Sequence, residues 1–599
     1  MKKIVLTWSM TFILSMSTLC ADAYKESMIR TLESIREIFH AAYAPAMWKK
    51  ENDGWDIDKE YEKAKDHILQ SQHLPLKEYQ QLIKKFLYSA KDYHVNIMFY
   101  STEEASLPFR VKTIGSRTFI DYVNFQKLPP HRYLLRAGDE LLAFNGTPIQ
   151  TVLESLRAQT RQANLATDQS LADLKLTERI GLMGDVVPKG LVTITSRSQK
   201  TGQIHTHQLM WNYHPEKIKN HDHMHAIAPL LAMPQLFETQ TFSLFNPLYS
   251  HRSLKMSHEE DVIGAPVSFV PELGEVVWKY EGQFDSRSSD DLFANLFSNS
   301  DPIAWNAYIY LNKEGRKIGY VRIPHYVADE EDAEALGKIL NFLDKTTEAL
   351  VIDQVNNGGG HANFLYKVAR MLTTKAMVTP KHRIKLTQED VFLSYEQLER
   401  IKFDLLLAER GLREEVDSEQ QLLFEKYFYE FLIEEWNQGR SFTQPIFLAG
   451  VDLIIPHPRY RYTKPVLMLI NELDFSCADF LPAILQDNSQ AVLFGTRTSG
   501  AGGYIKGTQL VNQFGILALT FTGSLAERDN MLKIESLGIT PDIEYQLTVE
   551  DVQGGYQPYA EAVNVAVSSL LPAEEEFTIL PIYGDKHSDE SIDFSEFGE

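Results

Sequence analysis

Cysteine is nearly absent from the sequence. The 599 residues contain two cysteines, Cys20 and Cys477. Cys20 lies in an N-terminal segment that we expect to be removed, which leaves a single thiol in the mature chain. An internal disulfide needs two thiols, so we predict that packing alone stabilises the fold.

Positive charge is also scarce. Lysine and arginine together number 59 against 81 aspartates and glutamates, which gives a formal net charge of −22. Nucleic-acid binding depends on lysine and arginine that neutralise phosphates, so we expect no nucleic-acid partner. Hydrophobic residues make up 44% of the sequence, and 27 tyrosines and 32 phenylalanines are typical of a globular protein. A chain of this length has room for several domains.

Long apolar runs are absent except near the N-terminus. There, the basic start Met1–Lys3 precedes the moderately apolar run Ile4–Leu19 and a group of small residues that ends at Ala23. This order predicts that residues 1–23 are a signal peptide and that the protein is secreted. Lipid attachment at Cys20 is disfavoured because the preceding leucine is larger than the usual small residue. No later run is long enough to cross a bilayer, so we expect no membrane anchor.

Residues 24–104 are predicted to be a helical region that ends in a strand. Apolar residues recur at three-to-four spacing from Ile29 to Phe39 and again from Tyr79 to Leu87. From Asp92 to Tyr100 the pattern changes to the alternation of a strand, with His94 at its beginning. A single histidine at a strand start is most often structural.

Residues 105–215 are predicted to be a PDZ-like domain. Gly138-Asp139 turns into the apolar strand Leu141–Phe144. Asn145-Gly146 then forms a tight hairpin turn that needs positive φ, and a helix starts at Thr151. This order resembles that of PDZ domains, which bind extended peptides by adding a strand to a sheet edge. A generic hairpin in a small β-domain is the alternative.

Residues 216–305 lack clear periodicity and are predicted to be a linker. His221, His223 and His225 alternate in this segment, but no cysteine and no HExxH motif stands nearby to complete a metal site. We therefore expect a polar loop there, and no metal or cofactor.

Residues 306–565 are predicted to be an α/β domain with a mostly parallel sheet, because short apolar strands alternate with helical patterns. The expected strands are Lys317–Ile323, Ala349–Asp353, Val466–Ile470 and Ala491–Gly495. A charged helical arm is expected from Glu389 to Trp436. The last residues, 566–599, are predicted to be an acidic tail.

Ser476 occupies the most informative position of this domain. The buried strand Val466–Ile470 ends before it, and apolar residues at helical spacing begin after Cys477. A hydroxyl at such a junction suits a nucleophile for acyl transfer, with the Cys477 amide as one donor to an oxyanion. Capping the helix is the alternative and the commonest task of serine at a helix start.

Several motifs in this order resemble the C-terminal processing (tail-specific) peptidases of family S41, which often carry a PDZ-like module upstream. They are Asp353 with Asn356-Asn-Gly-Gly-Gly360, the junction serine, Thr498-Ser-Gly-Ala-Gly502, and Glu535-x-x-Gly-Ile-x-Pro-Asp542. The resemblance implies a serine-type endopeptidase. One departure is central, because Ala501 stands where most of the family has the lysine base. An unassisted serine hydroxyl attacks amides too slowly to be useful.

A secreted branch of these peptidases uses a Ser-His-Glu triad instead, and the chain resembles it around Asp92-Tyr-His94 and Ile534-Glu535. This resemblance implies that Ser476 is the nucleophile, His94 the general base and Glu535 the carboxylate that orients the imidazole. It also implies that the backbone N–H groups of Cys477 and of Gly358 or Gly359 bind the oxyanion.

The same resemblance implies protein substrates in a host cell, a precursor activated by self-cleavage between about 225 and 300, and a homodimer. The chain departs from the branch at Gly358, where a proline is usual, and at His361, where a serine is usual.

Two alternatives stay open. The chain could be a catalytically silent PDZ-containing scaffold that binds extended peptides. Alternatively, the nucleophile could be Ser499 or Cys477. Ser499 follows no strand–helix junction, and a thiol at 477 would point away if Ser476 points into the site.

Overall fold

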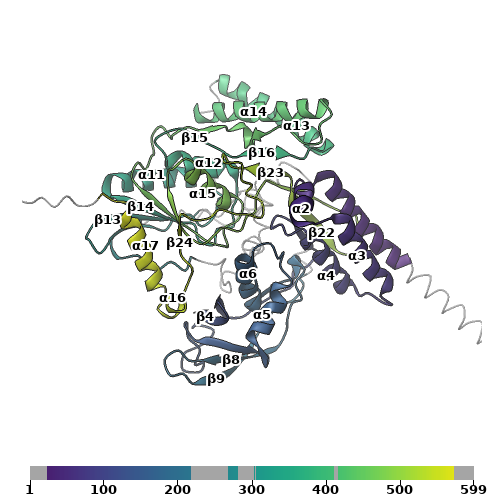
Figure 1. Ribbon diagram of the computed structural model, residues 1–599, viewed down its shortest axis with the longest axis vertical. Coiled ribbons are helices and arrows are strands. Elements are labelled where there is room, and N and C mark those ends of the chain that lie inside the picture. Colours follow the sequence, from purple (N-terminus) through teal and green to yellow (C-terminus); the bar gives the residue numbers. More distant parts are fainter. Residues whose placement is uncertain are drawn as a thin grey trace, which may run out of the picture.

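The computed structural model describes residues 23–217, 268–280, 303, 305–328, 330–410 and 416–572. Outside these ranges lie nearly all of the predicted signal peptide, the three histidines at 221, 223 and 225, and most of the predicted tail. The predicted mixed α/β architecture is confirmed. Figure 1 shows the N-terminal helices in purple, the PDZ-like region in blue and the α/β region in green and yellow.

The N-terminal region consists of a helix over 23–42 followed by three more. They are α2 (Ala46–Asp53), α3 (Ile57–Gln70) and α4 (Leu76–Tyr88). Their apolar faces pack on β1 (Asn96–Phe99), which pairs antiparallel with β22 (Ile516–Thr522) far along the chain. The strand therefore begins later than predicted, and His94 lies in the turn before it.

The PDZ-like region is a sheet of strands in the order β3-β4-β5-β8-β9, with β6 beside β5. The strands are β3 (Phe109–Ile114), β4 (Arg117–Val123), β5 (Glu140–Phe144), β6 (Thr147–Pro148), β8 (Leu191–Arg197) and β9 (Ile204–Met210). Helices α5 (Ile149–Arg157) and α6 (Leu165–Thr177) pack on it. Asn145 and Gly146 have φ of 51° and 77°, as the predicted hairpin turn requires. A small sheet joins β2 (Glu104–Ser106), β7 (Glu178–Ile180) and β10 (Asn212–His214).

The α/β region is built on a seven-stranded sheet. In spatial order its strands are β11 (Glu275–Lys279), β12 (Ala307–Leu311), β13 (Lys317–Arg322), β14 (Ala349–Asp353), β19 (Val466–Ile470), β20 (Val492–Gly495) and β24 (Ile543–Glu544). From β13 to β24 the pairing is parallel, as predicted. The prediction that 216–305 is entirely linker is wrong for β11, which pairs with β12 at the sheet edge.

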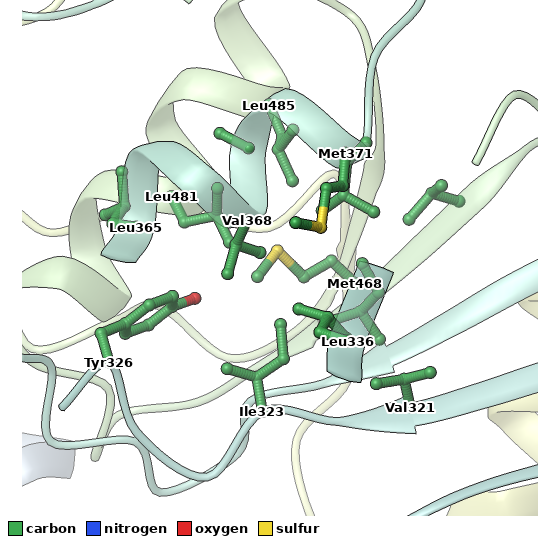
Figure 2. Close-up of a cluster of buried hydrophobic side chains, with 14 of the residues drawn as sticks. Val321, Ile323, Tyr326, Leu336, Leu365, Val368, Met371, Met468, Leu481 and Leu485 are labelled. Atoms are coloured by element: carbon green, nitrogen blue, oxygen red, sulfur yellow. The ribbon is translucent and has the colours of Figure 1, made fainter. Parts of the chain in front are cut away.

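Helices cover both faces of this sheet (Figure 1). One face packs against α11 (Glu330–Thr346), α12 (Ala362–Met371) and α15 (Cys477–Asp487). Figure 2 shows part of this apolar core, with Met468 of β19 among side chains of all three helices. The other face packs against α17 (Gln557–Ser569), which follows α16 (Val549–Gln553). Helix α17 runs beyond residue 565, so the acidic tail starts later than predicted.

The charged arm is a pair of helices, α13 (Gln388–Glu409) and α14 (Val416–Asn437), at the edge of the molecule (Figure 1). Short strands flank the arm in two small separate sheets, β15-β18 and β17-β16-β23. They are β15 (Met377–Val378), β16 (Lys381–Ile384), β17 (Ile446–Phe447), β18 (Leu453–Ile454) and β23 (Ser524–Glu527). Another strand, β21 (Ile505–Thr508), pairs with β22. Within the described ranges, every helix is too short or too polar to span a bilayer.

Candidate active site

Ser476 lies in a sharp turn between β19 and α15, as the sequence predicts. Its φ of 57° places it in a region that residues other than glycine rarely adopt, at a cost of about 1–3 kcal/mol. Its backbone N–H donates to Asp479 Oδ2 at 2.8 Å, which holds the turn. A strained strand-to-helix turn of this kind is where hydrolases of other folds place a nucleophilic serine.

Asp479 also anchors the glycine-containing loop Thr498–Gly502. Its carboxylate accepts hydrogen bonds from the Thr498 hydroxyl at 2.5 Å and from the N–H groups of Gly500 and Ala501 at 2.9 and 3.0 Å. Burial raises the pKa of Asp479 to about 6. The loop that carries the lysine base in most of the family is therefore fixed here to the helix that begins after Ser476.

Ala501 is fully buried in an apolar cluster with Tyr93, Leu171, Leu473 and Phe475. A methyl group thus fills the place of the lysine. The surroundings of this alanine offer apolar side chains to position 501, which is an unfavourable environment for an ammonium group.

His94 is held in the turn before β1, where its backbone N–H donates to Asp92 Oδ1 at 2.8 Å. The backbone of Gly502 lies close to its imidazole. Burial lowers the pKa of His94 to about 4, and the nearby Asp92 only partly opposes this effect. The imidazole is therefore neutral near pH 7, which is the protonation state that a general base requires.

The segments that carry His94 and Ser476 are in contact. The residues that precede them, Tyr93 and Phe475, pack edge to face with ring centroids 5.4 Å apart. Gly502 also lies against Glu535, because a Cβ at position 502 would be 2.3 Å from the Glu535 nitrogen. The Thr498–Gly502 loop therefore contacts the surroundings of all three residues of the predicted triad.

Glu535 is 1% exposed, and its two carboxylate oxygens have different surroundings. Oε1 accepts hydrogen bonds from Lys49 Nζ at 2.9 Å and from the Ser536 hydroxyl at 3.1 Å. Oε2 has no hydrogen-bond partner among the described residues. Burial and the proximity of Asp92 raise the pKa of Glu535 above its ordinary value, and Lys49 only partly opposes this rise. The next residue, Ser536, has a positive φ of 61°.

Lys49 was not found from the sequence. It lies in a short, strongly charged helix, and no spacing or motif distinguishes it from the other lysines of that helix. Only the tertiary structure brings it to Glu535.

The glycine loop after β14 lies directly against the nucleophile turn. Gly359 has a φ of 91°, and a Cβ there would lie 2.9 Å from Ser476 Cβ and 3.1 Å from the Cys477 nitrogen. The Gly359 N–H, however, donates to Asn357 Oδ1 at 2.7 Å. The Gly359 N–H is thus engaged in this arrangement, and its role as an oxyanion donor also stays a prediction. The roles of Cys477 and Gly358 stay predictions.

The two alternative nucleophiles are poorly placed for attack. The Cys477 thiol donates to the Gly360 carbonyl oxygen at 3.2 Å, and burial raises its pKa to about 12. It is therefore protonated at neutral pH and a weak nucleophile. The Ser499 hydroxyl is directed to Asp479 Oδ2 at 3.3 Å.

Comparison with known proteins identifies the family of this arrangement. The model of Peptidase family S41 matches residues 317–545, and the PDZ domain model matches residues 103–218. The chain belongs to peptidase family S41. Its relatives include an uncharacterized protein of Chlamydia muridarum, 32% identical over 603 residues that cover 93% of this chain and 94% of that protein. A protein of Chlamydia trachomatis is 31% identical, with the same coverage of 93% and 94%.

Solved structures agree with this assignment. Mature CPAF (Chlamydia protease-like activity factor) in complex with lactacystin is 29% identical, with a TM-score of 0.71 over 91% of this chain and 99% of that one. A CPAF variant with one serine replaced by alanine is also 29% identical, with a TM-score of 0.75 over 91% and 98%. Together with the S41 match, this similarity makes the chain a serine-type peptidase.

Proposed function

We propose that this S41 peptidase is an endopeptidase with a Ser476-His94-Glu535 triad. The observation that carries the proposal is the Thr498–Gly502 loop. It is bound to Asp479 beside Ser476, and its Gly502 lies near the imidazole of His94 and against the backbone of Glu535. Because this loop bears Ala501 in place of a lysine, the neutral imidazole is the base that the site offers.

In this mechanism Ser476 Oγ attacks the scissile carbonyl carbon while His94 Nε2 takes its proton. Glu535 accepts the Nδ1–H of the imidazole through Oε2, which fixes the tautomer and stabilises the imidazolium. The Cys477 N–H stabilises the negative charge that develops on the carbonyl oxygen. The imidazolium then gives its proton to the leaving amine, and water hydrolyses the acyl-enzyme by the same steps in reverse.

We infer that the substrates are proteins of a host cell and that the enzyme is exported. The similarity to CPAF and the predicted signal peptide support this inference. The solved relative is described as mature CPAF, which supports a precursor that is cut within the segment between about 225 and 300. We also propose that the active form is a homodimer, as the resemblance implies.

The triad assignment is tested with Ser476→Ala and a matched control, Ser499→Ala, in the full chain. A fluorophosphonate probe, cleavage of a protein substrate such as casein, and the size of the chain on a denaturing gel are measured together. Loss of a triad serine costs about 10³–10⁶-fold in rate. We expect Ser476→Ala to lose labelling, substrate cleavage and internal processing, and Ser499→Ala to keep all three.

Cleavage that persists in purified Ser476→Ala would overturn the assignment. A wild-type chain that binds peptides but neither reacts with the probe nor cleaves proteins would instead support the silent scaffold.

A further inference from the structure

Helix α2 is attached to the active site by a buried lysine. Of its eight residues, Lys49 is the one that is buried, with an exposed fraction of 0%. Lys49 Nζ donates to Glu535 Oε1 at 2.9 Å, to the Ser536 hydroxyl at 2.8 Å and to the Lys91 carbonyl oxygen at 3.0 Å. An ammonium group has three N–H bonds, and three acceptors surround this one.

Such a burial is costly and calls for an explanation. Removing an ammonium group and a carboxylate from water lowers stability unless the two are paired and their remaining hydrogen-bonding groups have partners. Of the other α2 side chains, Met47 is 67% exposed and Lys50 is exposed, while Ala46 packs on the apolar cluster of the N-terminal helices. The contacts of Lys49 with Glu535, Ser536 and Lys91 are polar contacts that hold this face of α2.

The charges around Glu535 show what the lysine does. Asp92, in the turn that holds His94, repels a charge on Glu535. The Asp92 carboxylate accepts hydrogen bonds from the hydroxyls of Tyr43 and Thr522 at 2.9 and 2.7 Å. Two carboxyl groups thus lie close together in a buried place, and Lys49 is the cation bonded to one of them. Without a cation, burial and the charge of Asp92 both favour a protonated Glu535.

We propose that Lys49 is a positioning residue that favours the ionised form of Glu535 and holds Oε1, so that Oε2 is left to accept the imidazole N–H of His94. This inference rests on the proposed Ser-His-Glu mechanism. Lys49 belongs to the N-terminal helices, which precede both the PDZ match at 103–218 and the S41 match at 317–545. The N-terminal region therefore completes the catalytic site of this chain with a second residue besides His94.

A double-mutant cycle tests the proposal. Lys49→Met, Glu535→Gln and the double variant are compared with wild type in kcat and KM for a peptide substrate at pH 7. The double variant replaces the ion pair by neutral groups of similar size, so it leaves no unpaired buried charge and should fold even if Lys49→Met alone does not.

We expect Glu535→Gln to lower kcat about 10²–10⁴-fold and Lys49→Met about 10–10²-fold, with KM nearly unchanged in both. In the Glu535→Gln background, Lys49→Met should lower kcat less than about threefold, because the lysine acts through the carboxylate. An equal loss in both backgrounds, or no loss in the wild-type background, would overturn the proposal.

The pH profile adds a readout that general loss of stability would not change. Loss of Lys49 should shift the acid limb of the pH profile of kcat/KM to higher pH by one unit or more, because Glu535 then deprotonates only at higher pH. Lys49→Arg, which keeps the charge, should leave the limb in place. The charged and titratable groups that interact with this carboxyl are Lys49, Asp92 and Tyr43.

Lys84→Met is the matched control. Lys84 of α4 is also buried and also pairs with a carboxylate, Asp185, at 3.0 Å; it also donates to the Met183 carbonyl oxygen, and neither partner belongs to the triad. We expect it to lower stability and leave the acid limb unchanged. An unshifted limb in Lys49→Met would contradict the inference alone. Wild-type kcat in Glu535→Gln would instead overturn the triad, and with it this inference.

Discussion

The molecule has two well-buried regions that differ in what stabilises them. The apolar core of the sheet (Figure 2) contains side chains such as Met468 and Leu481, and burial of apolar surface stabilises it. Beside it, the surroundings of Ser476 bury charged groups, including Asp479, Glu535 and Lys49. Each of these groups needs a specific partner, because burying it without one lowers the stability of the fold. This region contributes the reactive groups of the site instead of apolar packing. Substitutions in the first region should therefore affect stability alone, whereas substitutions in the second should lower the reaction rate as well.

The strongest test of this difference is Asp479→Ala. The change removes the acceptor that holds Ser476, Gly500 and Ala501, and leaves several buried N–H groups without a partner. We expect a loss of stability of about 3–5 kcal/mol. We also expect a fall in kcat of about 10²-fold or more, because the nucleophile turn and the loop are no longer fixed. Urea unfolding and steady-state kinetics measure the two effects.

Asp479→Asn retains one acceptor oxygen and serves as the milder comparison. Its loss of both stability and kcat should fall between wild type and alanine. Wild-type kcat in Asp479→Ala would show that the polar network is not needed for catalysis.

Met468→Ala probes the apolar core. Met468 is fully buried in β19, the strand that leads to Ser476. Its truncation should cost about 2–5 kcal/mol in stability, and Met468→Leu less than about 1.5 kcal/mol. Activity per molecule labelled by the fluorophosphonate probe should stay at the wild-type level. A fall in this specific activity would show that the two regions are not energetically separate.

The smallest expected effect concerns pH. Burial lowers the pKa of both His94 and His382 from 6.5 to about 4. A buried neutral histidine has a lower pKa in the folded chain than in the unfolded chain, so the unfolded chain takes up protons first as pH falls. The free energy of unfolding is therefore highest above pH 6.5 and decreases as pH falls towards 4. Each residue should contribute a loss of up to about 3 kcal/mol over this range.

Thermal unfolding between pH 7.5 and 4.5 measures this dependence. His382 lies outside the proposed triad, with its Nδ1 3.0 Å from the Ser524 hydroxyl. His382→Asn should therefore have a shallower pH dependence of stability than wild type. The same slope in both proteins would contradict the assignment of a neutral buried His382.

Much of the fold followed from the sequence because its strands and helices carry strong local signals. The apolar run Val466–Ile470 and the helix after Ser476 are where they were predicted. The errors lie at elements that depend on distant partners. Strand β11 is a short group of apolar residues between charged ones, and its place at the sheet edge depends on pairing with β12. Strand β1 begins at Asn96, where pairing with β22 begins.

The sequence by itself determined the strand–helix junction at Ser476 and the absence of a lysine base at Ala501, since both depend on neighbouring residues. The tertiary structure alone decided which groups surround that junction. Lys49 and Ser536 are 487 positions apart, yet their side chains are bonded, and Asp479 joins the nucleophile turn to the Thr498–Gly502 loop. Such contacts leave no local pattern, because a buried charge is placed by its partner and not by its neighbours in the chain.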